Sequence, residues 1–136
     1  MKNHGYVHLS AGDLLREEVN SKSENGELIN NYIKNGEIVP VEITINLLKT
    51  AMVKAGWATK KFLIDGFPRN EDNCSGWEKV VGDSAEVKGV IYFEVPEDVL
   101  EERIMQRAVS SGRVDDTREA AKKRFLTYTT QTFPII

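Results

Sequence analysis

The chain has 136 residues, a formal net charge of −3, 40% hydrophobic and 29% charged residues. This composition is typical of one soluble domain with a single core, and it excludes a disordered or fibrous protein. The slightly acidic balance and the lack of a long apolar run argue against a nucleic-acid binder and a membrane protein. A lone cysteine, Cys74, cannot form an internal disulfide, so we expect a cytoplasmic location, with the nucleus as a second compartment.

The first predicted unit is a strand that runs directly into a helix. Residues 5–9 are short and β-prone, and Ser10 with Asp13 three residues later is typical of a helix N-cap. Ser10 either only caps this helix or also faces a ligand, because helix starts behind strand ends are places where anions bind. Arg16, on the first turns, either faces the same ligand or is a solvated surface residue.

Two more helices and an extended hook precede the next predicted strand. The second helix is predicted over residues 23–36, with Gly36 as its C-cap, and the third over residues 41–55. Between them, residues 38–40 form an extended hook, because the residue before a proline avoids the helical conformation. This is more chain than one crossover between parallel strands requires. The segment therefore predicts a small lobe inserted over a site.

The stretch from Lys61 to Arg69 is the centre of the predicted fold. Residues 62–64 are an apolar run without alternation, which predicts a parallel strand buried on both faces. Asp65, Gly66 and Arg69 follow at its carboxyl end, where open α/β sheets bind their ligands. Asp65 could hold a metal-bound water and Arg69 could bind a phosphate. Alternatively, Asp65 caps the next helix and Arg69 lies on the surface.

The C-terminal half is predicted to contain three helices and one strand. Asn70 caps the first helix, residues 90–95 form a second buried strand, and Pro96 precedes a helix that ends near Arg107. A last helix is predicted to start at Asp116 with a capping box.

Several arginines gather in this half, and they can converge only if the loop between the two last helices folds back. They are Arg107, Arg113, Arg118 and Arg124. Converging guanidinium groups around a Ser- and Gly-rich segment, residues 108–117, suit a mobile lid over a polyphosphate. The alternative is a solvated pair of helices whose arginines have local acidic partners.

Four motifs stand in order along the chain, at residues 8–16, 36–40, 62–70 and 111–116. Together they resemble the motifs of the nucleoside monophosphate kinases, in particular of the branch that phosphorylates UMP and CMP and has a short lid. The resemblance implies a P-loop kinase-like, three-layer α/β/α fold with a parallel sheet. It also implies one domain over residues 1–136, with an NMP-binding lobe over residues 10–40 and a lid over residues 108–117.

The same resemblance implies an activity and its partners. The reaction would be phosphoryl transfer from Mg-ATP to CMP or UMP, giving ADP and the nucleoside diphosphate. Mg²⁺ and ATP would be required, the partners would be small-molecule nucleotides, and the complete enzyme would be a monomer. Alignment of the two nucleotides and neutralisation of their charge would supply the rate.

The resemblance further implies roles for individual residues. The acceptor nucleotide would be held by Ser10, Arg16, Glu37, Ile38, Val39, Gly66, Phe67, Arg69 and Asn73. Transfer would depend on Arg113, Arg118, Arg124 and Asp65, with Asp65 ordering the water shell of the magnesium, and Arg107 would bind the donor nucleotide. Asn73 would select the base, because its carboxamide offers both a donor and an acceptor to cytosine or uracil. The adenylate kinases of the family place a glutamine there.

One part of the family pattern is not found in these 136 residues. They contain no Gly-x-x-x-x-Gly-Lys phosphate loop, which in the family follows the first central strand, and they lack the family's last strand and helix. We therefore expect an incomplete sheet with unpaired edges and little or no turnover by this chain alone. Three alternatives stay open: an adenylate kinase, a non-catalytic relic that binds nucleotide, and an unrelated α/β binding module.

Overall fold

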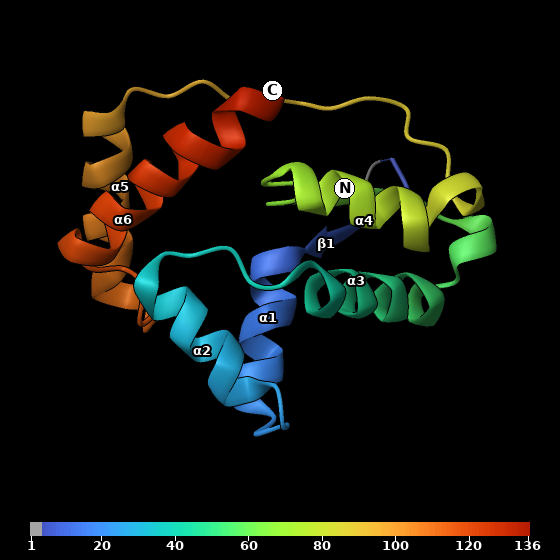
Figure 1. Cartoon of the computed structure of the whole chain (residues 1–136), viewed down its shortest axis with the longest axis horizontal. Helices are drawn as coiled ribbons and strands as arrows, with labels where there is room; N and C mark the ends of the chain where they lie inside the picture. The colour runs from blue at the N-terminus through green and yellow to red at the C-terminus, as the bar shows by residue number, and fades with distance from the viewer. Residues whose placement is uncertain (1–3) are drawn as a thin grey trace.

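Two short parallel strands form the sheet, and three helices connect them (Figure 1). In the computed structural model, which describes residues 4–136, the strands are β1 (Tyr6–Ser10) and β2 (Lys61–Asp65). The connecting helices are α1 (Ala11–Asn20), α2 (Gly26–Asn35) and α3 (Val41–Ala55). The predicted order of strand, three helices and strand is confirmed. Parallel pairing requires a crossover connection, and the three helices are longer than one crossover needs.

Three helices and several short turns make up the rest of the chain. The helices are α4 (Glu71–Val80), α5 (Glu97–Ser111) and α6 (Arg118–Thr127), and a π-helical turn, η3 (Tyr128–Thr132), continues α6. Short 3-10 turns lie at η1 (Trp57–Thr59), η2 (Gly82–Ser84) and η4 (Phe133–Ile135). Figure 1 shows α3 and α4 side by side on one flank of the molecule and α5 and α6 together on the other. Within residues 4–136, no helix is long and apolar enough to cross a membrane.

The main core lies on one face of the sheet. Val7 is paired with Phe62 and Leu9 with Ile64, so these four side chains share a face. They pack against Leu48 and Met52 of α3 together with residues of α1 and α4. The expectation that β2 is buried on both faces is wrong, because Leu63, on the other face, remains 40% exposed. The apolar residues of α1, α3 and α4 that form this core pack on the face that Val7 and Ile64 share.

A second, smaller core holds the segment between the strands together. Leu15 of α1, Ile29 of α2 and Val39 of the extended hook are buried against one another. Apolar residues of α1 and α2 at helical spacing surround them. Ile43 and Leu47 of α3 also pack against this cluster, so the second core joins α1, α2 and the hook to α3.

Most helix ends follow the predicted caps. Ser10 Oγ accepts a hydrogen bond from Asp13 N, and Asn70 Oδ1 accepts one from Asn73 N. Gly36 ends α2 in the left-handed conformation, at φ +68°. The helix α2 starts at Gly26 and not at residue 23, because residues 21–25 form a turn that closes against the end of α1.

Two boundaries near the arginines differ from the prediction. The helix α5 continues past Arg107 to Ser111 and ends at Gly112, so the loop between α5 and α6 covers residues 112–117. The cap of α6 is Thr117, whose side chain accepts from Ala120 N, and not Asp116. Asp116 is instead buried in an ion pair, so its carboxylate cannot cap the helix.

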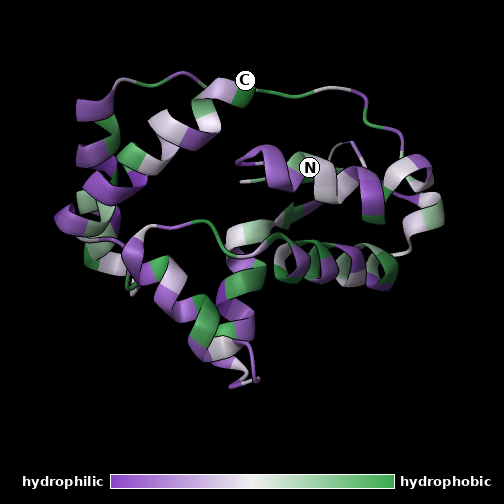
Figure 2. Cartoon of the chain, in the orientation of Figure 1, coloured by the Kyte–Doolittle hydropathy of each residue, from purple (hydrophilic) through white to green (hydrophobic). Residues whose placement is uncertain are grey.

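The strand predicted at residues 90–95 is absent from the described structure. These residues form an extended segment without regular secondary structure, and Val90, Ile91 and Phe93 are 78%, 73% and 82% exposed. A strand needs a neighbour for its backbone hydrogen bonds, and none of the described strands lies beside this segment. Figure 2 shows hydrophobic residues along this bridge between the two flanks of the molecule. The local sequence thus favours a strand for which residues 4–136 provide no partner.

Candidate active site

The turn after β2 holds Arg69 in a fixed position. Gly66 has a φ of +74°, and its carbonyl accepts a hydrogen bond of 2.6 Å from Arg69 Nε. The positive φ favours a glycine at position 66, and a Cβ there would lie 2.9 Å from Arg69 Nη2 and displace the guanidinium. The backbone of Arg69 is held as well, because its N–H donates to Asn73 Oδ1 and its carbonyl accepts from Thr132 Oγ1.

Positive charge gathers around Arg69. Burial lowers the pKa of its guanidinium, and the nearby charges of Arg124 and Arg16 lower it further. The carboxylates of Asp65 and Asp115 act in the opposite direction, but the net direction remains downward. The structure therefore brings together three predicted arginines from α1, the β2–α4 turn and α6. An anion bound among them would relieve their mutual repulsion.

Arg113 joins this group through the carboxylate of Asp13, which the sequence predicts only as part of a helix cap. Asp13 Oδ1 accepts a hydrogen bond of 3.3 Å from Arg113 Nη2 and a shorter one from Arg16. The bond to Arg16 is the main reason why the pKa of Asp13 is lowered, and Arg113 contributes to the shift. Asp13 therefore ties the loop after α5 to the start of α1. The only sequence signal for this role is its place in the motif at residues 8–16.

Arg107, on α5, does not contact the group around Arg69 but binds a residue of the loop that follows α5. Its Nε and Nη2 donate to the two carboxylate oxygens of Asp116 at 2.9 and 2.6 Å. Ser111 Oγ donates to the same carboxylate at 2.7 Å, and the Asp116 side chain is fully buried. The hydrogen bonds from Arg107, and then from Ser111, lower the pKa of Asp116 against the effect of burial. In this structure Arg107 therefore fixes the loop of residues 112–117.

Arg124 and Arg118, both on α6, lie in different environments. Arg124 Nη1 donates to Asp115 Oδ2 at 3.0 Å, while the other oxygen of this buried carboxylate has no hydrogen-bond partner. Arg118 is 72% exposed and pairs with Glu101 at 3.6 Å. Arg118 therefore lies apart from the group around Arg69.

Some of the residues predicted to hold the base and ribose are buried in the fold, and others are accessible to a ligand. Asn73 is only 2% exposed, and its carbonyl oxygen is already used by the N–H of Arg69. Val39 is buried in the lobe core, and Phe67 packs its ring 5.8 Å from that of Trp77. Glu37 is exposed and Ile38 half-buried, which leaves this part of the hook accessible.

Asp65 fits a water-mediated contact with a magnesium ion. It is exposed at the end of β2, with His8 Nε2 at 3.9 Å from its Oδ2. Within residues 4–136, no group of three or more metal-ligating side chains is formed. A single carboxylate is nevertheless what Mg²⁺ often uses, because it keeps several waters and binds phosphate oxygens for the rest.

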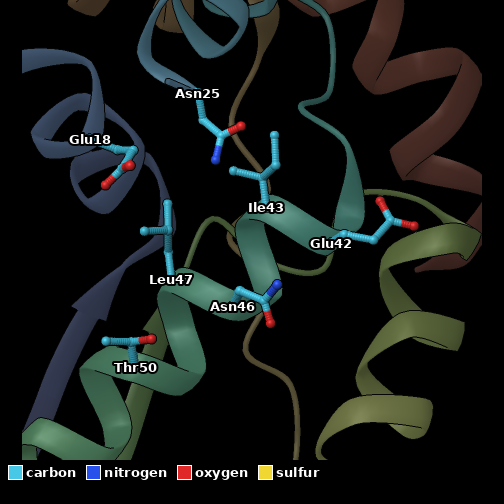
Figure 3. Close-up of a pocket in the computed structure, with 7 residues that line it drawn as sticks. All are labelled: Glu18, Asn25, Glu42, Ile43, Asn46, Leu47 and Thr50. Atoms are coloured by element: carbon cyan, nitrogen blue, oxygen red, sulfur yellow. The ribbon is translucent and has the colours of Figure 1, made fainter. Parts of the chain in front are cut away.

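A separate hollow contains none of the predicted site residues (Figure 3). It lies between the end of α1, the start of α2 and the first half of α3. Its lining residues are Glu18, Asn25, Glu42, Ile43, Asn46, Leu47 and Thr50. The arginines described above thus do not converge on this hollow.

Comparisons with known proteins agree over the whole length of the chain. A family model described as adenylate kinase matches residues 1–136. The UMP-CMP kinase of Gallus gallus is 54% identical over 140 aligned residues, which cover all of this chain and 71% of the chicken protein. The UMP-CMP kinases of Danio rerio and Homo sapiens are 52% and 51% identical with the same coverage.

Proposed function

The chain belongs to the adenylate kinase family of nucleoside monophosphate kinases, and on this premise we propose that it carries the acceptor and lid parts of a UMP-CMP kinase. The proposed reaction is transfer of the terminal phosphoryl group of Mg-ATP to CMP or UMP. The 136 residues contain no Gly-x-x-x-x-Gly-Lys sequence, so we expect little turnover from them alone.

The observation that carries the proposal is the group of Arg16, Arg69 and Arg124. Burial, and then the charges of Arg124 and Arg16, lower the pKa of Arg69, and gathered positive charge of this kind favours an anion at this place. We assign the acceptor phosphate to Arg16 and Arg69, and the transferred phosphoryl group to Arg124 and Arg113. Guanidinium groups suit this work because their planar donors match phosphate oxygens in pairs.

We assign the donor nucleotide to a residue that forms an internal ion pair in this structure. In this proposal, Arg107 turns from Asp116 to the donor nucleotide, and Arg118 assists when residues 108–117 close as a lid. Asp65 would hold the magnesium through its water shell, and the ion would neutralise phosphate charge when ATP is bound. The residues of this chain would contribute alignment, charge and exclusion of water.

We further propose that Asn73 selects pyrimidines through its amide group. Because its carbonyl oxygen accepts from Arg69 N, the group left for a base is the NH₂ donor. Cytosine and uracil both carry a carbonyl oxygen at C2 that can accept a hydrogen bond from such a donor. Ser10 and residues 37–39 would line the ribose and base within the lobe of residues 10–40.

Titration calorimetry with the full chain tests the proposal. CMP and UMP should bind, AMP should bind more weakly, and Arg69→Gln should weaken CMP at least tenfold, as the loss of a charged hydrogen bond would. Arg103→Gln removes an exposed arginine of α5 that has no role in this proposal, so it is the matched control and should leave CMP binding unchanged. Equal binding of CMP and cytidine would contradict a phosphate site at Arg69. A preference for AMP would favour an adenylate kinase.

A further inference from the structure

The C-terminal helical segment of residues 118–132 contacts two parts of the proposed acceptor site through threonine hydroxyls. Thr132 Oγ1 donates to the carbonyl of Arg69 at 2.7 Å. The hydroxyl of Thr127 shares its proton between the carbonyl of Gly36 at 2.9 Å and that of Lys123, in its own helix, at 3.0 Å. Gly36 leads into the hook that follows α2, while Arg69 belongs to the turn after β2. One helical segment is therefore attached to two parts of the site that lie on different elements.

We propose that Thr127 and Thr132 are positioning residues that set the distance between these two parts of the acceptor site. The inference rests on the proposed function and deepens it, since neither threonine needs to touch the nucleotide. Thr132 would act through Arg69, and Thr127 through the backbone of Gly36. Rigid support of this kind is what phosphoryl transfer demands, because small displacements of aligned groups are costly.

The segment packs so closely against Gly36 that it fixes the distance between α6 and the end of α2. A Cβ at Gly36 would lie 3.0 Å from Lys123 Cβ and 3.1 Å from Arg124 N. The backbone of α6 therefore lies directly against the end of α2. Arg124, one of the arginines assigned to the phosphates, stands at this contact.

The π-helical turn of residues 128–132 gives Thr132 its direction. In a regular α-helix, residues five apart point about 140° away from each other. The hydrogen bond from Phe133 N to Tyr128 O closes a wider turn, which adds a residue and rotates Thr132 back toward the side of Thr127. Both hydroxyls can then reach the site from one helical segment.

Neighbouring threonines of the same turn lack this role and provide a control. Thr130 Oγ1 donates to Leu126 O at 2.7 Å, within its own helical segment. Thr130→Val therefore removes a hydroxyl of the same chemistry without touching either part of the site. Thr132→Ser keeps the donor, whereas Thr132→Val removes it with nearly the same shape.

Calorimetry of the full chain with CMP and with cytidine tests the inference. Thr132→Val should weaken CMP about fivefold, as expected for one lost hydrogen bond, and Thr132→Ser should restore it. Cytidine binding should not change, because Arg69 has no phosphate to bind there. Thr130→Val should match the wild-type chain. An equal loss for CMP and cytidine, or no loss for CMP, would overturn the inference.

A second measurement separates failure of the inference from failure of the proposed function. Amide hydrogen exchange over residues 66–73 needs no ligand, and it should speed up in Thr132→Val but not in Thr130→Val. If the wild-type chain does not bind CMP, the proposed function fails, and unchanged exchange in Thr132→Val would overturn the inference as well. If CMP binds, Thr127→Val and Thr132→Val should combine non-additively, because both act on one distance.

Discussion

At the scale of single residues, the aspartates organise the site as much as the arginines do. Asp13 holds Arg16 and Arg113, Asp115 holds Arg124, and Asp116 holds Arg107. Each pair joins elements that are distant in sequence or closes the loop after α5. The structure thus keeps the arginines near their proposed places with internal partners, which a bound polyphosphate would partly replace.

The pair of Asp116 and Arg107 should be important for stability. Asp116→Asn would leave Arg107 without its charged partner, and we expect a loss of about 3 kcal/mol in the free energy of unfolding. The exposed variant Arg118→Gln should change it by less than about 0.5 kcal/mol. Urea unfolding of both variants measures the difference. Equal stability of Asp116→Asn and the wild type would show that the pair is not formed.

The same carboxylate predicts a pH dependence. The folded-state pKa of Asp116 is lowered, so its contribution to stability is fully present above the unfolded value of about 3.9 and is lost as the pH falls through the folded value. In Asp116→Asn this part of the acid destabilisation should disappear. Unfolding free energies measured from pH 6 downward would reveal it, and parallel curves for the two proteins would contradict it.

Gly66 should be required for anion binding. Gly66→Ala places a Cβ against the guanidinium of Arg69 at a positive φ, so we expect a destabilisation of about 1 kcal/mol and a displaced Arg69. CMP should then bind at least several-fold more weakly in calorimetry. Gly112→Ala is a control for the backbone strain, since it has a φ of +63° but no atom within 4 Å. Equal loss of affinity in both would remove the specific role of Gly66.

At the scale of elements, the packing of α3 against α4 depends on a close approach. A Cβ at Gly76 would lie 2.5 Å from Val41 Cγ2 and 2.9 Å from Ile45 Cδ1. Trp77, the next residue along α4, packs against Phe67 and joins the core beside the sheet. The absence of a side chain at position 76 therefore lets α4 carry the turn of Gly66 to Arg69 close to α3.

We expect Gly76→Ala to destabilise the protein despite the better helix propensity of alanine. The gain in propensity is about 1 kcal/mol, while overpacking costs about 1–3 kcal/mol, so a net loss of about 1 kcal/mol should result. Gly89→Ala, at a position with open space around it, should be neutral. Thermal unfolding distinguishes the two. A stabilised Gly76→Ala would mean that α4 moves away from α3 at little cost.

Local patterns predicted the elements that depend on local interactions. Caps at Ser10, Gly36 and Asn70 and the apolar periodicity of α3 gave those boundaries correctly, because these signals act within a few residues. The strand at residues 90–95 failed because pairing depends on a distant partner. The helix α5 ends later than predicted because it continues through its serines to Ser111, whose hydroxyl contacts the buried carboxylate of Asp116.

The proximity of the candidate site residues was predictable to a similar extent. The motifs identified Arg16, Arg69, Arg113 and Arg124, and the structure brings them close to one another or links them through Asp13. No local pattern could indicate that Asp116 holds Arg107, since this contact depends on how the loop after α5 folds. The contact of Thr132 with Arg69 likewise depends on how the last helical segment folds back. Arg118 shows the reverse case, a candidate by its sequence that lies at the surface.

At the scale of the whole molecule, the apolar surface is distributed unevenly. The sheet has its core on one face, and the segment of residues 90–95 exposes several large apolar side chains. Tyr92 of this segment is held by a hydrogen bond between its hydroxyl and that of Tyr128. Exposed, β-prone segments of this kind promote association between chains.

Substitutions should separate this exposed segment from the true core. Phe93→Ser should change the free energy of unfolding by less than about 0.5 kcal/mol and reduce self-association. Ile45→Ala, at a position that is 1% exposed, should cost about 3 kcal/mol. Urea unfolding and light scattering measure the two effects. A large loss of stability in Phe93→Ser would show that residues 90–95 are packed as a strand.

Both tryptophans lie before residue 85, so the intrinsic fluorescence of the protein reports on this part of the chain. Trp57 donates from its indole nitrogen to the carbonyl of Ser84, and Trp77 lies against Phe67 beside the turn after β2. Residues 85–136 contain no tryptophan. Intrinsic emission should therefore respond when a ligand alters the turn beside Arg69, while rearrangements confined to α5 and α6 leave the spectrum unchanged.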